Sequence, residues 1–126
     1  MLTKKYIQFK HENETWLRTL DYFQQENIYL KNRLAQIAKT NINNNFLNEL
    51  ESYQNRFVDK DTVISILRYD ISEQNDLIDK NPTEDAAAIN KIILKQNKLR
   101  EDMQQMEREF NRLKFDFNNY LAEVLQ

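Results

Sequence analysis

The stretch that decides the fold is residues 89–124, which read INKIILKQNKLREDMQQMEREFNRLKFDFNNYLAEV. Apolar side chains recur here at alternating intervals of three and four residues, and ten of the eleven positions in this register are apolar. The positions are Ile89, Ile92, Gln96, Leu99, Met103, Met106, Phe110, Leu113, Phe117, Tyr120 and Val124. A spacing that averages 3.5 residues places them on one stripe of an α-helix. The stretch therefore predicts a long helix that buries one face against other helices.

Two earlier segments carry the same register. It is apolar at nine of twelve positions from Leu2 to Asn41, and at eight of ten from Phe46 to Ile78. Short connections between helices of similar length make neighbouring helices run antiparallel. We therefore expect an all-α fold, an antiparallel three-helix bundle of long helices with coiled-coil heptad packing. It forms a single domain over residues 1–126, with helices at about 3–40, 45–79 and 82–125.

Composition excludes several classes of function. The 126 residues include no glycine, no cysteine and one proline, and the net charge is -2. Glycine-rich phosphate loops, thiolate zinc sites and cysteine nucleophiles are therefore ruled out. We expect a non-enzymatic protein with no catalytic, cofactor-binding or metal-binding residues. Because no apolar run is long enough for a signal peptide or a membrane span, a cytoplasmic location is expected. The sixteen asparagines and ten glutamines indicate an AT-rich, bacterial source.

Asparagine replaces glycine at the two expected connections. The run of residues 41–45 contains four asparagines and predicts the first turn. The second connection reads as a helix start, with Asn81 as N-cap, Pro82 at the first helical position and Glu84 at the third.

Two questions about the helices stay open, the start of the first helix and the continuity of the second. Thr3 is a candidate cap for the first helix, but lysines in the first turn oppose the helix dipole, so a start near Asn13 is an alternative. In the second helix Asp61 is a candidate internal N-cap, so a kink at 59–61 is the alternative to a continuous helix.

In outline the chain resembles a spectrin-type repeat. It has three long helices of about that size, and Trp16 followed by Leu17 stands where that family often carries an aromatic pair. The third helix departs from the pattern, because Phe110 and Phe117 stand where a second tryptophan is expected. The resemblance, an analogy of architecture, implies a spacer or protein-docking module without catalytic residues.

Polar residues interrupt the apolar stripes at Asn13, Asn27, Lys60, Gln74 and Gln96. We interpret the amides as a polar core layer that fixes helix register, while Lys60 extends toward an acid. Asn27→Leu should then raise the melting temperature and broaden the distribution of assembly states. The alternative is a small-ligand site in the middle of the bundle, formed by Asn27 and Lys60 with Met103 and Met106.

Two parts of the expected surface are candidates for binding. Tyr22 and Tyr29 lie seven residues apart beside Ile28, and together they form a possible interaction surface, since tyrosine is enriched at protein interfaces. Near the N-terminus, the basic residues 4, 5, 10 and 11 alternate with Tyr6 and Phe9, as in segments that bind nucleic acid or membrane surfaces. The only histidine, His11, is expected to face solvent.

The leading hypothesis is a helical protein-interaction or structural module that self-associates as a homo-oligomer and takes a protein partner rather than a small-molecule substrate. An alternative is an accessory or chaperone-like adaptor subunit of a larger complex. A remote alternative is a nucleic-acid or membrane-surface binder that uses the basic and aromatic N-terminal segment.

Overall fold

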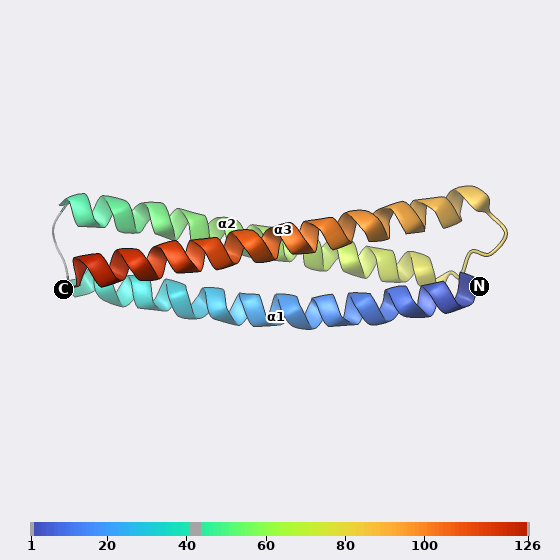
Figure 1. Cartoon of the computed structure of the whole chain (residues 1–126), viewed down its shortest axis with the longest axis horizontal. Helices are drawn as coiled ribbons and strands as arrows, with labels where there is room; N and C mark the ends of the chain where they lie inside the picture. Colours follow the sequence, from blue (N-terminus) through green and yellow to red (C-terminus); the bar gives the residue numbers. More distant parts are fainter. Residues whose placement is uncertain (1, 41–43, 126) are drawn as a thin grey trace.

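The computed structural model describes residues 2–40 and 44–125, which form three α-helices and, within these ranges, no strand. The helices are α1 (Leu2–Thr40), α2 (Asn44–Asp79) and α3 (Ala86–Val124). They lie side by side as long rods, with α2 antiparallel to the other two, so each chain terminus lies near a connection (Figure 1). The predicted all-α three-helix bundle is confirmed.

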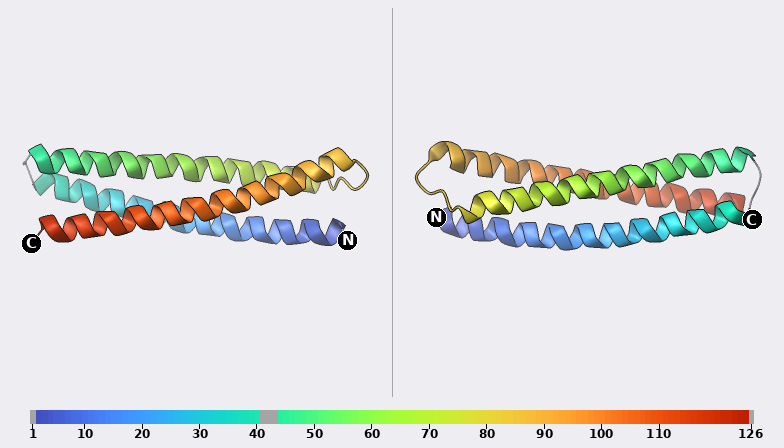
Figure 2. Two further views of the ribbon diagram at one scale, coloured as in Figure 1. Left: turned by 45° about the horizontal axis from the view of Figure 1, so that its top comes forward. Right: turned by 180° about the vertical axis from the view of Figure 1, so that it is seen from behind.

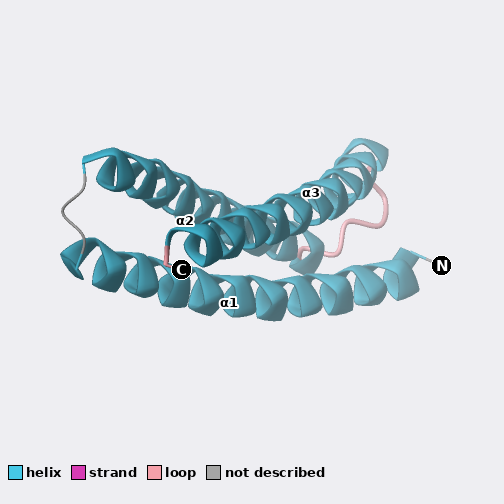
Figure 3. Cartoon of the chain, turned by 60° about the vertical axis from the view of Figure 1, so that its left-hand side comes forward, coloured by secondary structure: helices cyan, strands magenta, loops and turns pink. Residues whose placement is uncertain are grey.

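The helices wind around one another. Seen from two further directions, α3 crosses the other helices at a shallow angle (Figure 2). The crossing of α2 and α3 is clearest in the view toward one end of the bundle (Figure 3). Winding of this kind follows from a repeat of 3.5 residues on helices of 3.6 residues per turn, because the apolar stripe drifts slowly around each helix.

The core follows the predicted register along the bundle. Most of it is one cluster of buried side chains from all three helices, in which Phe57, Phe110 and Phe117 are almost fully buried. The Phe57 and Phe117 rings meet edge to face, with centroids 5.1 Å apart. A smaller cluster near the N-terminus consists of Tyr6, Phe9, Ile78 and Ile92.

Three apolar residues depart from the expected packing. Val124, predicted in the stripe, is 38% exposed because it lies in the last turn of α3, where no further turn stacks over it. Ile28 and Ile66, apolar residues outside the predicted register, are 39% and 55% exposed.

The predicted start of the third helix is wrong. Asn81 does not cap α3, because it adopts a left-handed conformation (φ 48°) and its amide donates to the carbonyl of Ile78 at 2.8 Å, which ends α2. The N-cap is Asp85, whose side chain accepts from the amides of Ala87 and Ala88 at 3.0 and 3.3 Å. Helix α3 therefore begins at Ala86, four residues later than predicted, and Pro82 and Glu84 precede it.

The other boundary alternatives are also decided. Helix α1 is continuous from Leu2, so Thr3 is inside it and the alternative start near Asn13 is not used. Helix α2 is continuous through 59–61. The predicted turn at residues 41–45 lies partly outside the described residues, and α2 begins at Asn44.

Candidate functional site

A layer of buried amides joins the three helices in the half of the bundle nearest the N-terminus. Asn13, Gln74 and Gln96 come from α1, α2 and α3, and each is fully buried. The Gln96 amide group donates to Asn13 Oδ1 at 2.8 Å, and the Gln74 amide group donates to Gln96 Oε1 at 3.0 Å. Asn13 in turn donates to Asn75 Oδ1 at 2.8 Å. These bonds can form in only one alignment of the helices, so the layer specifies their register.

An ion pair covers one side of this amide layer. The Arg100 guanidinium donates two hydrogen bonds to the Glu12 carboxylate, at 2.7 and 2.8 Å, and Gln96 donates a third at 2.8 Å. Burial raises the pKa of Glu12, but the hydrogen bonds from Arg100 and Gln96 and the Arg100 charge outweigh it, so the pKa lies below its ordinary value. Glu12 is therefore a fixed anion that holds α1 against α3.

Asn27 belongs to a separate contact between α1 and α2. Its amide group donates to the Phe57 carbonyl at 2.9 Å and to Asp61 Oδ1 at 2.7 Å, and the same Asp61 pairs with Lys31. Asn27 is fully buried, and its Oδ1 accepts no hydrogen bond from the described residues. No hydrogen bond joins it to the layer of Gln74 and Gln96 in the described chain.

Lys60 extends toward an acid as expected. A fold at Asn81 would bring Lys60 level with about Asp102, whereas its Nζ lies 2.9 Å from Glu109 of α3, one heptad further along. The late start of α3 moves the fold point toward the C-terminus and shifts the pairing by that heptad. Met103 and Met106 are buried in the apolar core. The four residues of the hypothetical ligand layer therefore do not form one polar site.

Ile28 and Tyr29 of the predicted surface line two different grooves, and Tyr22 lines neither of them. Tyr29 lines a cleft of about 490 Å³ that also includes Leu125, the residue after α3. Ile28 lines a different cleft of about 230 Å³ between α1 and α2, together with Arg68. Adjacent residues on a helix point about 100° apart, so Ile28 and Tyr29 cannot share one groove.

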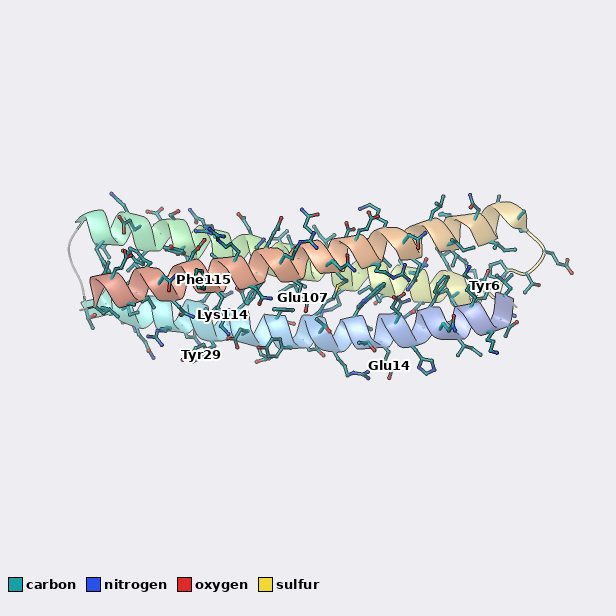
Figure 4. The ribbon with its side chains drawn as sticks, in the orientation of Figure 1. Tyr6, Glu14, Tyr29, Glu107, Lys114 and Phe115 are labelled. Carbon is teal, nitrogen blue, oxygen red and sulfur yellow. The ribbon has the colours of Figure 1, made fainter. Side chains whose placement is uncertain are left out.

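Tyr22 and Tyr29 instead share a surface with α3. The Lys114 ammonium pairs with Glu26 between the two helices, which raises the pKa of Lys114, and both tyrosine hydroxyls lie close enough to add to that rise. Phe115, the next residue of α3, points about 100° away from Lys114, and Figure 4 shows Tyr29, Lys114 and Phe115 at the same end of the bundle. Tyr22, Tyr29 and Phe115 are 59%, 58% and 62% exposed. We call these three rings the aromatic patch.

A second surface, the α2/α3 groove, was not predicted. Three adjoining clefts of about 380, 290 and 360 Å³ run along these helices. Glu109 lines the first and second, and Asp70 and Lys98 line the second and third. Val63 and Ile66 of the groove lie outside the predicted apolar register, and nothing in the sequence marks Lys95 or Lys98 as part of a binding surface.

The remaining candidates do not assemble into a site. Tyr6 and Phe9 of the N-terminal segment are buried, and the Tyr6 hydroxyl donates to the Pro82 carbonyl at 2.8 Å, so neither ring is available to stack on a base. His11 is exposed. Over the described ranges, no group of three acidic or histidine side chains could hold a metal ion, and no helix is long and apolar enough to cross a membrane.

Comparison with known proteins does not place the chain in a family. No family model matches the chain, and no curated protein or solved structure matches it either. The likeness to spectrin-type repeats remains one of architecture.

Proposed function

We propose that this protein is a non-enzymatic helical interaction module that self-associates through the aromatic patch. The observation that carries the proposal is the exposure of Tyr22, Tyr29 and Phe115, each more than half accessible to solvent. Tyr29 of α1 and Phe115 of α3 lie at the same end of the bundle (Figure 4). Large aromatic rings dominate the energetics of protein interfaces because they bury much area and lose little side-chain entropy.

The surroundings of the patch suit an interface. Glu26 and Lys114 form an ion pair beside the rings, so a partner that covers the rings meets charges that already neutralise each other. The bundle contains only three helices, so its buried core is small relative to its exposed surface. Association of two copies would therefore also add to its stability.

The alternative, an accessory or adaptor subunit of a larger complex, is supported by the α2/α3 groove. This groove and the aromatic patch lie on different helix pairs, so one chain could contact two partners at once. Such a protein would remain monomeric alone and assemble only with its complex.

Light scattering coupled to size-exclusion chromatography tests the proposal. The wild type should be a dimer or larger at micromolar concentration, and Tyr22→Ser/Tyr29→Ser should shift it toward the monomer without loss of helix by circular dichroism. Tyr69→Ser is the matched control, because Tyr69 is 67% exposed on α2. A wild type that stays monomeric, or an equal effect of Tyr69→Ser, would contradict self-association through the patch.

A further inference from the structure

The α2/α3 groove has an excess of positive charge at one end. The cleft there is lined by four cations, Arg56, Lys60, Arg108 and Arg112, and by two acids, Asp59 and Glu109. Lys60 is neutralised by Glu109. Arg56 and Arg112 share the single carboxylate of Asp116, at 3.6 and 3.2 Å.

Arg108 is the least compensated of these cations. It is exposed, and no carboxylate of the described residues lies within ion-pair distance of it. Guanidinium groups bind carboxylates through two parallel hydrogen bonds, so this end of the groove is suited to acidic side chains. The excess contrasts with the chain as a whole, whose net charge is -2.

Beyond this basic end, the groove has an apolar floor and a rim of mixed apolar and charged side chains. Leu67 and Met106 of the second cleft and Leu99 of the third are core residues that reach the floor. Ile66 and Leu94 stand at the rim, 55% and 59% exposed. The lysines at this far end are paired with acids, Lys95 with Glu73 and Lys98 with Asp102, each at 2.9 Å.

We propose that the α2/α3 groove binds an amphipathic helix of a partner protein, with acidic residues at one end of that helix lying on Arg56, Arg108 and Arg112. The groove runs along α3 from Leu94 to Arg112, so a helix of about 18 residues spans it, about 27 Å. Apolar residues at heptad spacing would cover Ile66 and Leu94 and complete a four-helix bundle. The uneven charge fixes which end of the partner lies where. This inference rests on the proposed role as an interaction module but not on self-association.

Fluorescence anisotropy with designed peptides tests the inference on the full chain. The probes are labelled amphipathic helices with leucine at heptad positions and a glutamate cluster at either the N-terminal or the C-terminal end. One of them should bind at micromolar concentration, and the same peptides with lysine in place of glutamate should bind about tenfold more weakly or worse. Equal binding of the lysine peptides, or no binding of either acidic peptide, would overturn the proposal.

Variants of the groove locate the binding. Arg108→Glu/Arg112→Glu and, separately, Ile66→Lys should each weaken binding of the acidic peptide at least about tenfold. Arg18→Glu is the control, because Arg18 is an exposed arginine of α1. Thermal melts establish that each variant is folded. If inorganic tripolyphosphate displaces the peptide and Ile66→Lys has no effect, the groove is an anion site and the helix proposal is wrong.

The two proposals can fail separately. Tyr22→Ser/Tyr29→Ser should bind the peptide as the wild type does, and Ile66→Lys should leave the oligomeric state unchanged. Loss of peptide binding in the tyrosine variant would show that the groove depends on the aromatic patch, which contradicts a separate docking site.

Discussion

At the scale of single residues, the buried amide side chains differ in whether their hydrogen-bond partners have a second partner. Gln96 is the central member of the amide layer, because Asn13 Oδ1 accepts its hydrogen bond and has no second donor among the described residues. Asn27 donates to two acceptors that would still have another partner if Asn27 were replaced. The Phe57 carbonyl lies inside α2, where the amide four residues later also donates to it. The Asp61 carboxylate also pairs with Lys31.

Gln96→Leu should therefore lower stability. It leaves Asn13 Oδ1 buried without a donor, which costs about 1 to 3 kcal/mol. Chemical denaturation of the single variant should show this loss, and the double variant Asn13→Leu/Gln96→Leu should recover part of it, because the buried Asn13 Oδ1 is then no longer present. A double variant as unstable as the sum of both single variants would contradict this reading of the layer.

Asn27→Leu should have the opposite effect. It removes the buried Oδ1 that accepts no hydrogen bond, and its former partners keep their other bonds, so the melting temperature should rise. If Asn27 also limits alternative pairings, light scattering should show a broader distribution of assembly states. A lower melting temperature with a single assembly state would mean that the bonds to Phe57 and Asp61 are worth more than the unpaired oxygen costs.

The ion pair of Glu12 predicts a dependence of stability on pH. Because the pKa of Glu12 is lower in the folded than in the unfolded state, its contribution is present above the unfolded pKa and is lost as the pH falls through the folded value. In urea melts, the stability difference between wild type and Glu12→Gln should therefore be constant above the ordinary glutamate pKa of 4.5 and shrink as the pH falls below it. A stability difference that does not change with pH would contradict this prediction. Glu14→Gln is the control for the removal of one surface charge.

At the scale of elements, the helix ends decide how the helices align. Asn81 and Asp85 have separate roles at the second connection. Asn81 adopts the left-handed conformation that ends α2, and the Asp85 side chain accepts hydrogen bonds from the first amides of α3. The residues between them set the fold point, and hence place Lys60 opposite Glu109 rather than Asp102.

Asp85→Ala should destabilise the protein by about 1 kcal/mol, because the amides of Ala87 and Ala88 lose their acceptor. Hydrogen exchange of these two amides should become faster in the variant. Glu84→Ala is the control, since Glu84 lies before the helix, and it should change stability much less. A larger loss from Glu84→Ala would favour the helix start that the sequence suggested.

At the scale of the whole molecule, the bundle has one of two possible hands. Helix α1 presents Lys10, Gln24 and Lys31 to α2. It presents Glu12 and Glu26, on the other flank of its apolar stripe, to α3. The two glutamates pair with Arg100 and Lys114 at the same sequence separation, as expected for parallel helices in one register.

Exchange of charge across α1 and α3 tests this arrangement. Glu26→Lys places two cations together and should destabilise the bundle by up to about 1 kcal/mol, and Glu26→Lys/Lys114→Glu should recover most of that loss. Denaturant titrations at low salt measure both effects. No recovery in the double variant would contradict the pairing, and thus the hand of the bundle.

The sequence alone determined the class of structure. The alternation of three and four residues in all three segments specifies the helices and their buried faces, because a helix places such residues on one stripe whatever it packs against. The same pattern correctly marked Asn13, Gln74 and Gln96 as core residues and Tyr22 and Tyr29 as surface residues. It misplaced the start of α3, because Asn81 suits either a helix end or a helix start until its neighbours are positioned.

The tertiary structure decided which surfaces exist. An apolar stripe is the same in both hands of a three-helix bundle, so the sequence does not specify which flank of α1 faces α3. That choice brings Glu12 to Arg100 and gathers the cations of two distant segments, Arg56 on α2 and Arg108 and Arg112 on α3, into one groove. Contacts between residues far apart in the chain depend on packing in three dimensions, which no local periodicity encodes.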